Sequence, residues 1–99
     1  MSGRTDWTEL RQRRLAEPGA ADAYEAARLA FELGQAVREL REQHSWSQAQ
    51  LAQASGMTQS AVARFEAGGT VPTLPVLERL AHALDVELAV KFTSRTAAA

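Results

Sequence analysis

The sequence predicts an all-α fold, a bundle of about five helices with an N-terminal helical extension and one C-terminal β-strand. Three observations support this prediction. Apolar residues recur at helical spacing over most of the chain. Residues that suit the start or the end of a helix separate these stretches. Only near the C-terminus does the apolar pattern change to the alternation that is typical of a strand.

Composition limits the classes of protein that need to be considered. The 99 residues suit one domain, and 45% of them are hydrophobic, which is enough for one small core. The chain has no cysteine, so disulfides and thiolate chemistry are excluded. His44 and His82 have no companions at ligand spacing, so we expect no metal site and no cofactor. No nucleophile–base pair or phosphate-binding loop is visible, so we do not expect an enzyme.

The sequence carries no segment that directs the chain to or through a membrane. No apolar run approaches the roughly 20 residues that a membrane span requires. The N-terminus, MSGRTDWTEL, lacks the apolar core of a signal peptide. We therefore expect a cytoplasmic protein that has no membrane partner.

Residues 1–32 are predicted to form the N-terminal helical extension. Residues 6–9, DWTE, resemble a helix-capping signature, and a helical pattern follows until residues 18–19, Pro-Gly, interrupt it. Residues 22–25, DAYE, open a second and longer helix, whose apolar positions are Leu29, Leu33, Val37 and Leu40. Gly34 within this helix costs about 1 kcal/mol relative to alanine, and it marks either a bend or the junction with the core domain.

Two short helices joined by a tight turn are predicted next. Residues 47–50, SQAQ, form a capping box that begins the first helix, and Gly56 suits the left-handed residue that ends it. Thr58 can cap the second helix, which ends near Gly68 and Gly69. The apolar residues of the two helices that we expect in the core are Leu51, Ala52, Val62 and Phe65.

A last helix and a strand complete the prediction. Thr73 can cap the helix, Pro75 is tolerated in its first turn, and Asp85 ends it. Its apolar stripe comprises Leu74, Leu77, Leu80, Ala81 and Leu84. The strand has the alternating apolar residues Val86, Leu88, Val90 and Phe92. A lone strand needs a partner, so these four residues are predicted to pair across the two-fold axis of a homodimer, or alternatively with a sheet edge of another protein.

The run from Leu40 to Val86 resembles the Xre-type (phage-repressor-like, Cro/C1) helix-turn-helix family. It reads LREQHSWSQAQLAQASGMTQSAVARFEAGGTVPTLPVLERLAHALDV. The matching elements, in family order, are SQ followed by LA, a glycine, TQSAV, R-F-E-x-G, a proline and L-x-x-L-A-x-A-L. The resemblance implies a lambda-repressor-like DNA-binding domain over residues 33–86, with residues 87–99 as the strand and tail.

The same resemblance implies contacts with double-stranded operator DNA for Gln48, Thr58, Gln59, Ser60, Arg64 and Thr70. The Gln59 amide can both donate to and accept from adenine, and Arg64 can bind guanine with two hydrogen bonds, which is worth about 1–3 kcal/mol of discrimination. Ser60 and Arg64 share a helix face because they are four residues apart. Gln48 matches a glutamine that touches phosphate and braces the reading amide. The alternative interpretation of these residues is a merely solvated helix face.

Two further features bear on this interpretation. Arg41 and Glu66 match a pair that forms a partly buried salt bridge in such repressors. The net charge is −1, and the family's frequent basic residue after the reading helix is replaced here by Gly69 and Thr70. A monomer with so few cations facing phosphate binds DNA weakly, so we expect a dimer.

The N-terminal extension resembles, more loosely, that of host-inhibition (HigA-type) antitoxins, which pair with a ribonuclease toxin of the RelE-like fold. The resemblance implies a cognate toxin as a partner, with Trp7, Leu10, Leu15 and Tyr24 as toxin-binding residues. The alternative is that the extension completes the core of its own chain or lengthens a dimer interface.

Together these observations predict a DNA-binding antitoxin that neutralises a RelE-like ribonuclease toxin and autorepresses its operon. One alternative is a stand-alone Xre-type transcriptional regulator. An alternative of another class is a protein-interaction module that does not bind DNA.

Overall fold

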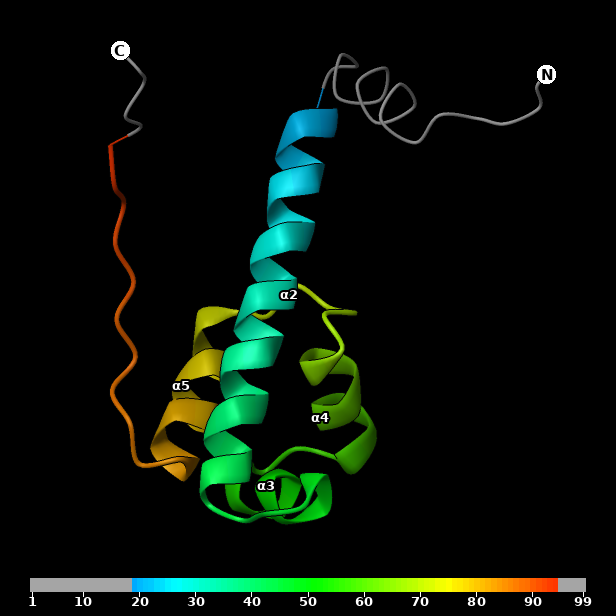
Figure 1. The fold of residues 1–99 in the computed structure, drawn as a ribbon, viewed down its shortest axis with the longest axis vertical. Helices are drawn as coiled ribbons and strands as arrows, with labels where there is room; N and C mark the ends of the chain where they lie inside the picture. Colours follow the sequence, from blue (N-terminus) through cyan, green and yellow to red (C-terminus); the bar gives the residue numbers. More distant parts are fainter. Residues whose placement is uncertain (1–18, 95–99) are drawn as a thin grey trace, which may run out of the picture.

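A computed structural model of the protein describes residues 19–94, which contain four helices. These are α2 (Ala20–Gln43), α3 (Gln48–Ser55), α4 (Gln59–Glu66) and α5 (Leu74–Ala83). Figure 1 shows α3 lying across the lower end of α2, with α4 and α5 on opposite sides of α2. The helical pattern predicted ahead of residues 18–19 lies outside the described residues.

Helix α2 is the longest element, with 24 residues, and spans about 36 Å. Its first turns extend beyond the other helices, whereas its last turns pack against them (Figure 1). In the projecting part, Arg28 pairs with Glu25 and Glu32 at N–O distances of 2.7 Å each. Such exposed pairs one turn apart stabilise a helix only slightly, because water screens the charges. The predicted boundary between residues 32 and 33 falls inside this continuous helix, and the division into domains stays a prediction.

Gly34 is the point of closest approach between α2 and the end of α4, and α2 continues through it. A Cβ atom at Gly34 would lie 2.3 Å from the carbonyl oxygen of Phe65 and 2.9 Å from that of Glu66. Both neighbouring atoms belong to the backbone, so a side chain has no room there. The residue that costs helix propensity is thus the one that lets the two backbones meet.

The caps predicted at Ser47, Thr58 and Thr73 are confirmed, whereas the predicted start of the long helix at residues 22–25 is wrong. Helix α2 begins two residues earlier, at Ala20, and no side chain caps it. The Ser47 hydroxyl accepts from the Gln50 amide at 3.1 Å, and the Gln50 side chain accepts from the Ser47 amide at 2.7 Å. Gly56 ends α3 in the left-handed region, with φ 73°. Thr58 caps α4 through its hydroxyl, which accepts from the Ala61 amide at 3.0 Å, and Thr73 caps α5 in the same way.

The core lies where all four helices meet. Leu51, Val62, Leu80 and Leu84 are fully buried. Around them pack the other buried members of the same cluster, Val37, Ala52, Phe65 and Leu77. Trp46, in the connection between α2 and α3, packs against this core and stacks on His44 with ring centroids 4.8 Å apart.

The prediction of five helices and a C-terminal strand is wrong for the part of the chain that the structure describes. Residues 19–94 contain four helices and no strand. After α5, the chain runs as an irregular trace from Asp85 to residue 94 (Figure 1). The alternating pattern sets only the sides on which apolar residues lie, whereas a strand also needs a second backbone to pair with. Leu88 packs against the core, but Val90 and Phe92 are 66% and 102% exposed.

Within residues 19–94, no helix combines the length and the apolar character that crossing a bilayer requires.

Candidate DNA-binding surface

The exposed side of α4 carries the side chains that the sequence predicts to read bases. Gln59, Ser60 and Arg64 are exposed, whereas Val62 and Phe65 on the opposite side are only 1% and 3% exposed. The helix is eight residues long, so its apolar side is held by the core while its first turn faces outward. The amide and hydroxyl of the first turn and the Arg64 guanidinium of the last turn together have the chemistry for hydrogen bonding to base edges.

Thr58 and Thr70 lie at the two ends of this surface. Thr58 is exposed, and its hydroxyl is engaged as the N-cap of α4. Thr70 is partly buried in the connection between α4 and α5. Together with Ala61, Arg64 and Val71 it lines a hollow of about 230 Å³. This volume is below the roughly 300 Å³ at which small-molecule pockets begin.

A polar network behind this surface joins three helices. Arg41 of α2 donates to both carboxylate oxygens of Glu66 on α4, at 2.7 Å (Nε to Oε2) and 3.0 Å (Nη2 to Oε1). Its third nitrogen, Nη1, donates to the Trp46 carbonyl at 2.7 Å. The side-chain amide of Gln48, at the start of α3, donates to Oε1 of Glu66 at 3.1 Å.

This network is largely shielded from water. The side chains of Arg41 and Glu66 are 12% and 4% exposed. The hydrogen bond with Glu66 raises the pKa of Arg41 above its ordinary value, so the guanidinium stays charged at every pH at which the protein is studied. Because the pair is bidentate and Gln48 completes the coordination of the carboxylate, the network fixes the end of α4 relative to α2 and α3.

Gln48 has a partner that the resemblance does not imply, because its side-chain amide donates to Glu66. The implied contacts of Gln48 with phosphate and with the Gln59 side chain stay predictions. The start of α3 and the end of α4 lie together in the fold, and this proximity decides the partner.

Arg79 is a residue of this region that the sequence analysis missed. It lies on α5, yet its guanidinium donates to the carbonyls of Ser55 and Gly56, at 3.2 Å and 3.1 Å, in the turn between α3 and α4. No local pattern could have shown this, because the contact depends on how α5 packs against α3. Within α3, α4 and the turn between them, Arg64 is the one basic residue, so Arg79 adds a second cation to the helix-turn-helix.

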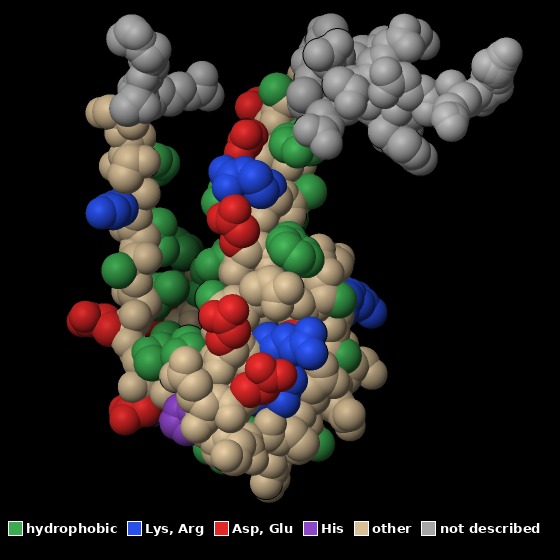
Figure 2. All heavy atoms as spheres, in the orientation of Figure 1, with side chains coloured by type: hydrophobic (Ala, Val, Ile, Leu, Met, Phe, Trp, Pro, Cys, Tyr) green, Lys and Arg blue, Asp and Glu red, His purple; other side chains and the backbone are tan. Residues whose placement is uncertain are grey.

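The exposed face of α2 has the opposite character. Figure 2 shows acidic side chains along this helix, with basic ones between them. Arg28 and Arg38 are each paired with glutamates on α2 itself. Carboxylates outnumber guanidinium groups on α2, so the helix carries net negative charge.

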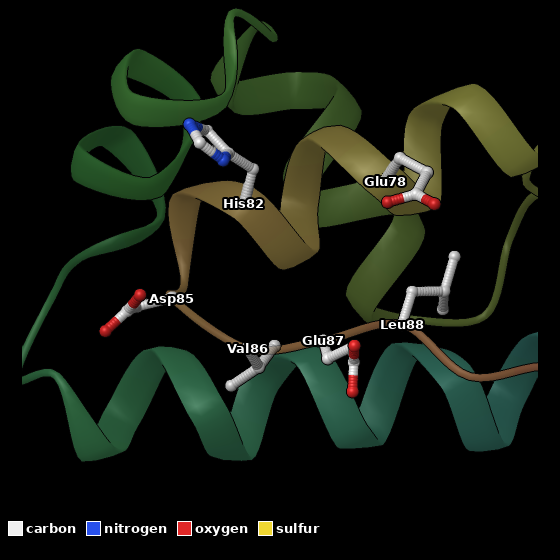
Figure 3. A pocket seen from close by; sticks show the side chains of 6 residues that line it. All are labelled: Glu78, His82, Asp85, Val86, Glu87 and Leu88. Carbon is white, nitrogen blue, oxygen red and sulfur yellow. The ribbon is translucent and has the colours of Figure 1, made fainter.

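A second hollow, of about 560 Å³, lies beside the end of α5 and is lined by Glu78, His82, Asp85, Val86, Glu87 and Leu88. Figure 3 shows that the His82 ring, the Asp85 carboxylate and the Glu87 carboxylate point in different directions. Among the described residues, no group of three His, Cys, Asp or Glu side chains is arranged to hold a metal ion. The described residues that line this hollow therefore supply no ligand set for a metal ion.

Of the predicted toxin-binding residues, Trp7, Leu10 and Leu15 lie outside the described residues. Tyr24 is described and is 41% exposed on the projecting part of α2. The four residues predicted for dimerisation follow α5 and form no strand, and their role in an interface stays a prediction.

Comparison with known proteins identifies the domain. The family model described as "Helix-turn-helix" matches residues 37–91, from the last two turns of α2 to the segment after α5. No curated protein and no solved structure matches the chain significantly. The matched range includes α3, α4 and the turn between them, and thus the candidate DNA-binding surface. The chain therefore belongs to the Xre-type helix-turn-helix family and is a DNA-binding regulator of that type.

Proposed function

We propose that this protein is a repressor that binds a specific operator by inserting α4 into the major groove. The observation that carries the proposal is the division of α4 into a buried side and an exposed side with Gln59, Ser60 and Arg64. Base edges in the major groove present donors and acceptors that these side chains can match. The buried network at the other end of α4 supports the proposal, because a reading helix must be held rigidly.

We propose further that the repressor acts as a dimer. Arg64 and Arg79 are the cations of the helix-turn-helix region, and the net charge of the chain is −1. Few phosphate contacts mean weak binding by one copy. Two copies on a palindromic operator would place two reading helices in successive major grooves, about 34–36 Å apart.

Substitution of the reading residues tests the proposal. Gln59→Ala and Arg64→Ala are each expected to weaken binding to the selected operator by about 1–3 kcal/mol, or about 5- to 150-fold, because each removes paired hydrogen bonds to a base. Both side chains are exposed, so stability should change by less than about 0.5 kcal/mol. Fluorescence anisotropy with a labelled duplex measures the affinities.

Gln53→Ala is the matched control. Gln53 is an exposed amide on α3, outside the surface proposed to read bases, and its loss should leave affinity unchanged. Equal binding by the Gln59, Arg64 and Gln53 variants would contradict base reading by α4. If the affinity for the duplex does not fall with added salt, the result would instead favour a protein-interaction module that does not bind DNA.

We propose as a second role that the protein neutralises a toxin through the projecting part of α2 and the residues before it. Two aromatic side chains, Tyr24 and Phe31, are 41% and 52% exposed there. They are seven residues apart, so they lie on the same side of the helix. The neighbouring carboxylates of Asp22, Glu25 and Glu32 outnumber Arg28 and suit a basic partner surface.

Co-purification with the product of the neighbouring gene tests this role. The wild-type chain is expected to retain that product and to suppress its toxicity, and Tyr24→Ala should weaken the complex by about 2 kcal/mol or more if Tyr24 is an anchor. Val71→Ala is the control, because Val71 is 70% exposed but lies on the connection between α4 and α5. Operator binding without any complex would leave a stand-alone regulator.

A further inference from the structure

The turn of the helix-turn-helix is bound from outside by a side chain of α5. Arg79 donates from Nε to the Ser55 carbonyl at 3.2 Å and from Nη2 to the Gly56 carbonyl at 3.1 Å. These two residues end α3 and begin the turn that leads through Met57 and Thr58 to α4. One planar guanidinium therefore holds two successive peptide carbonyls of the turn.

We propose that Arg79 is a positioning residue for operator recognition, which sets the angle at which α4 leaves α3. The inference rests on the proposed function, since it assigns a role in presenting the reading helix. Arg79 does not belong to α3 or α4, and it is 15 residues or more from the reading residues Gln59, Ser60 and Arg64 in the sequence. Its effect on recognition is exerted through the turn.

The chemistry of the turn explains why a cation is suited to this place. The last carbonyls of a helix have no partners within the helix and carry partial negative charge. At the end of α3, the Ala52 carbonyl accepts from the Met57 amide at 2.9 Å. The Ser55 and Gly56 carbonyls, by contrast, are reached by the Arg79 guanidinium. Arg79 therefore completes the C-terminal cap of α3 from a different helix.

The geometry explains why this contact acts on α4. Only Met57 and Thr58 separate Gly56 from the first residue of α4, Gln59. Gly56 has φ 73°, and a rotation about its backbone redirects the helix that follows. Binding residues must be held within about 0.5 Å of their productive positions. Fixing the carbonyls on both sides of the Gly56 nitrogen limits that rotation.

Arg79 is not committed to an ion pair in the described part of the chain. The salt bridges there involve Arg28, Arg38 and Arg41. A contact with DNA phosphate is therefore the competing role for this exposed guanidinium. Substitution by lysine distinguishes the two roles. An ammonium is a point charge that can still contact a phosphate, but it lacks the fork that spans two carbonyls.

The test uses the full chain and a duplex of about 30 base pairs that the wild-type protein selects from a random library, long enough for two half-sites. Arg79→Met keeps the aliphatic stem, and it is expected to reduce affinity for the selected duplex about tenfold, because charged hydrogen bonds to the turn are lost. Affinity for an unselected duplex and the slope of affinity against salt should stay unchanged. Arg79→Lys should show most of the loss of affinity for the selected duplex that Arg79→Met shows.

Amide hydrogen exchange supplies a readout that needs no DNA. In Arg79→Met, the Met57 amide, which donates to the Ala52 carbonyl, should exchange faster than in the wild type. The Leu84 amide, which donates to Leu80 at the end of α5, should be unaffected. Glu78→Gln, at the exposed neighbouring position on α5, is the matched variant and should change neither affinity nor exchange.

Each result decides one point. If Arg79→Lys binds like wild type and Arg79→Met lowers the salt slope by about 1, Arg79 contacts phosphate and the positioning role is overturned. Unchanged operator affinity in Arg79→Met also overturns it, and so does a loss of affinity that is equal for selected and unselected duplexes. If the wild-type chain selects no duplex, the proposed function itself has failed.

Discussion

Glu66→Gln is expected to lower the free energy of unfolding by about 3–5 kcal/mol, the largest effect of any single substitution proposed here. The carboxylate is 4% exposed and accepts hydrogen bonds from Arg41 and Gln48. Glutamine keeps the size of the side chain but removes the charge, and it places an amide donor against the donors of the guanidinium. The Arg41 cation, 12% exposed, is then left without its counter-charge.

Urea unfolding followed by circular dichroism at neutral pH measures this effect. The control is Glu32→Gln, which breaks the ion pair with Arg28 on the exposed face of α2, where both side chains are about half exposed. That loss should be far smaller, because water screens the exposed pair. Similar small losses in both variants would show that burial adds nothing to the Arg41–Glu66 pair.

The pH dependence of this pair follows from the direction of the pKa shift. Glu66 raises the pKa of Arg41 in the folded state, chiefly through its hydrogen bond to the guanidinium. A group whose folded-state pKa is raised contributes stability that is fully present below its unfolded pKa and is lost as pH rises through the folded value. The contribution of Arg41 is therefore constant across neutral pH and disappears only in strongly alkaline solution.

Gly34→Ala is expected to destabilise the protein by about 1–3 kcal/mol, although alanine is the better helix former by about 1 kcal/mol. The added Cβ would lie 2.3 Å from the Phe65 carbonyl oxygen, so α2 and α4 must move apart. Helix propensity and packing predict opposite signs for this substitution. The sign of the change in unfolding free energy therefore decides which effect is larger.

Ala27→Gly is the matched control, since Ala27 lies on the same helix at an exposed position. Its expected loss is about 1 kcal/mol, from helix propensity alone. If Gly34→Ala stabilised the protein by the amount that Ala27→Gly destabilises it, the close approach of the two backbones would be disproved.

Features that depend on a few neighbouring residues were predictable from the sequence. The caps at Ser47, Thr58 and Thr73 and the helix end at Gly56 were identified correctly, because a hydroxyl or a glycine acts on amides within three residues of itself. The buried side of α4 followed from the spacing of Val62 and Phe65. The helix-turn-helix family followed from the order of such elements over residues 40–86, and the family match extends over residues 37–91.

Features that depend on which distant residues meet were decided by the tertiary structure. The sequence predicts a bend or a junction at Gly34, because it shows only that glycine lowers the helix propensity of α2. It does not show that the backbone of α4 packs against this residue. Gln48 pairs with Glu66, and Arg79 with the turn at Gly56, because the packing of α3, α4 and α5 brings them together.

The C-terminal segment shows that a local pattern can also predict an element that the tertiary structure does not form. Residues 86–92 have the alternation of a strand, yet no second strand among residues 19–94 supplies the hydrogen bonds that would make them one. The sequence by itself determined the local elements, their caps and the family, since these depend on interactions within a turn or two of helix. The tertiary structure alone decided the partners of Glu66, Gly34 and Arg79, because hydrogen bonds and backbone contacts between helices exist only once the helices have packed.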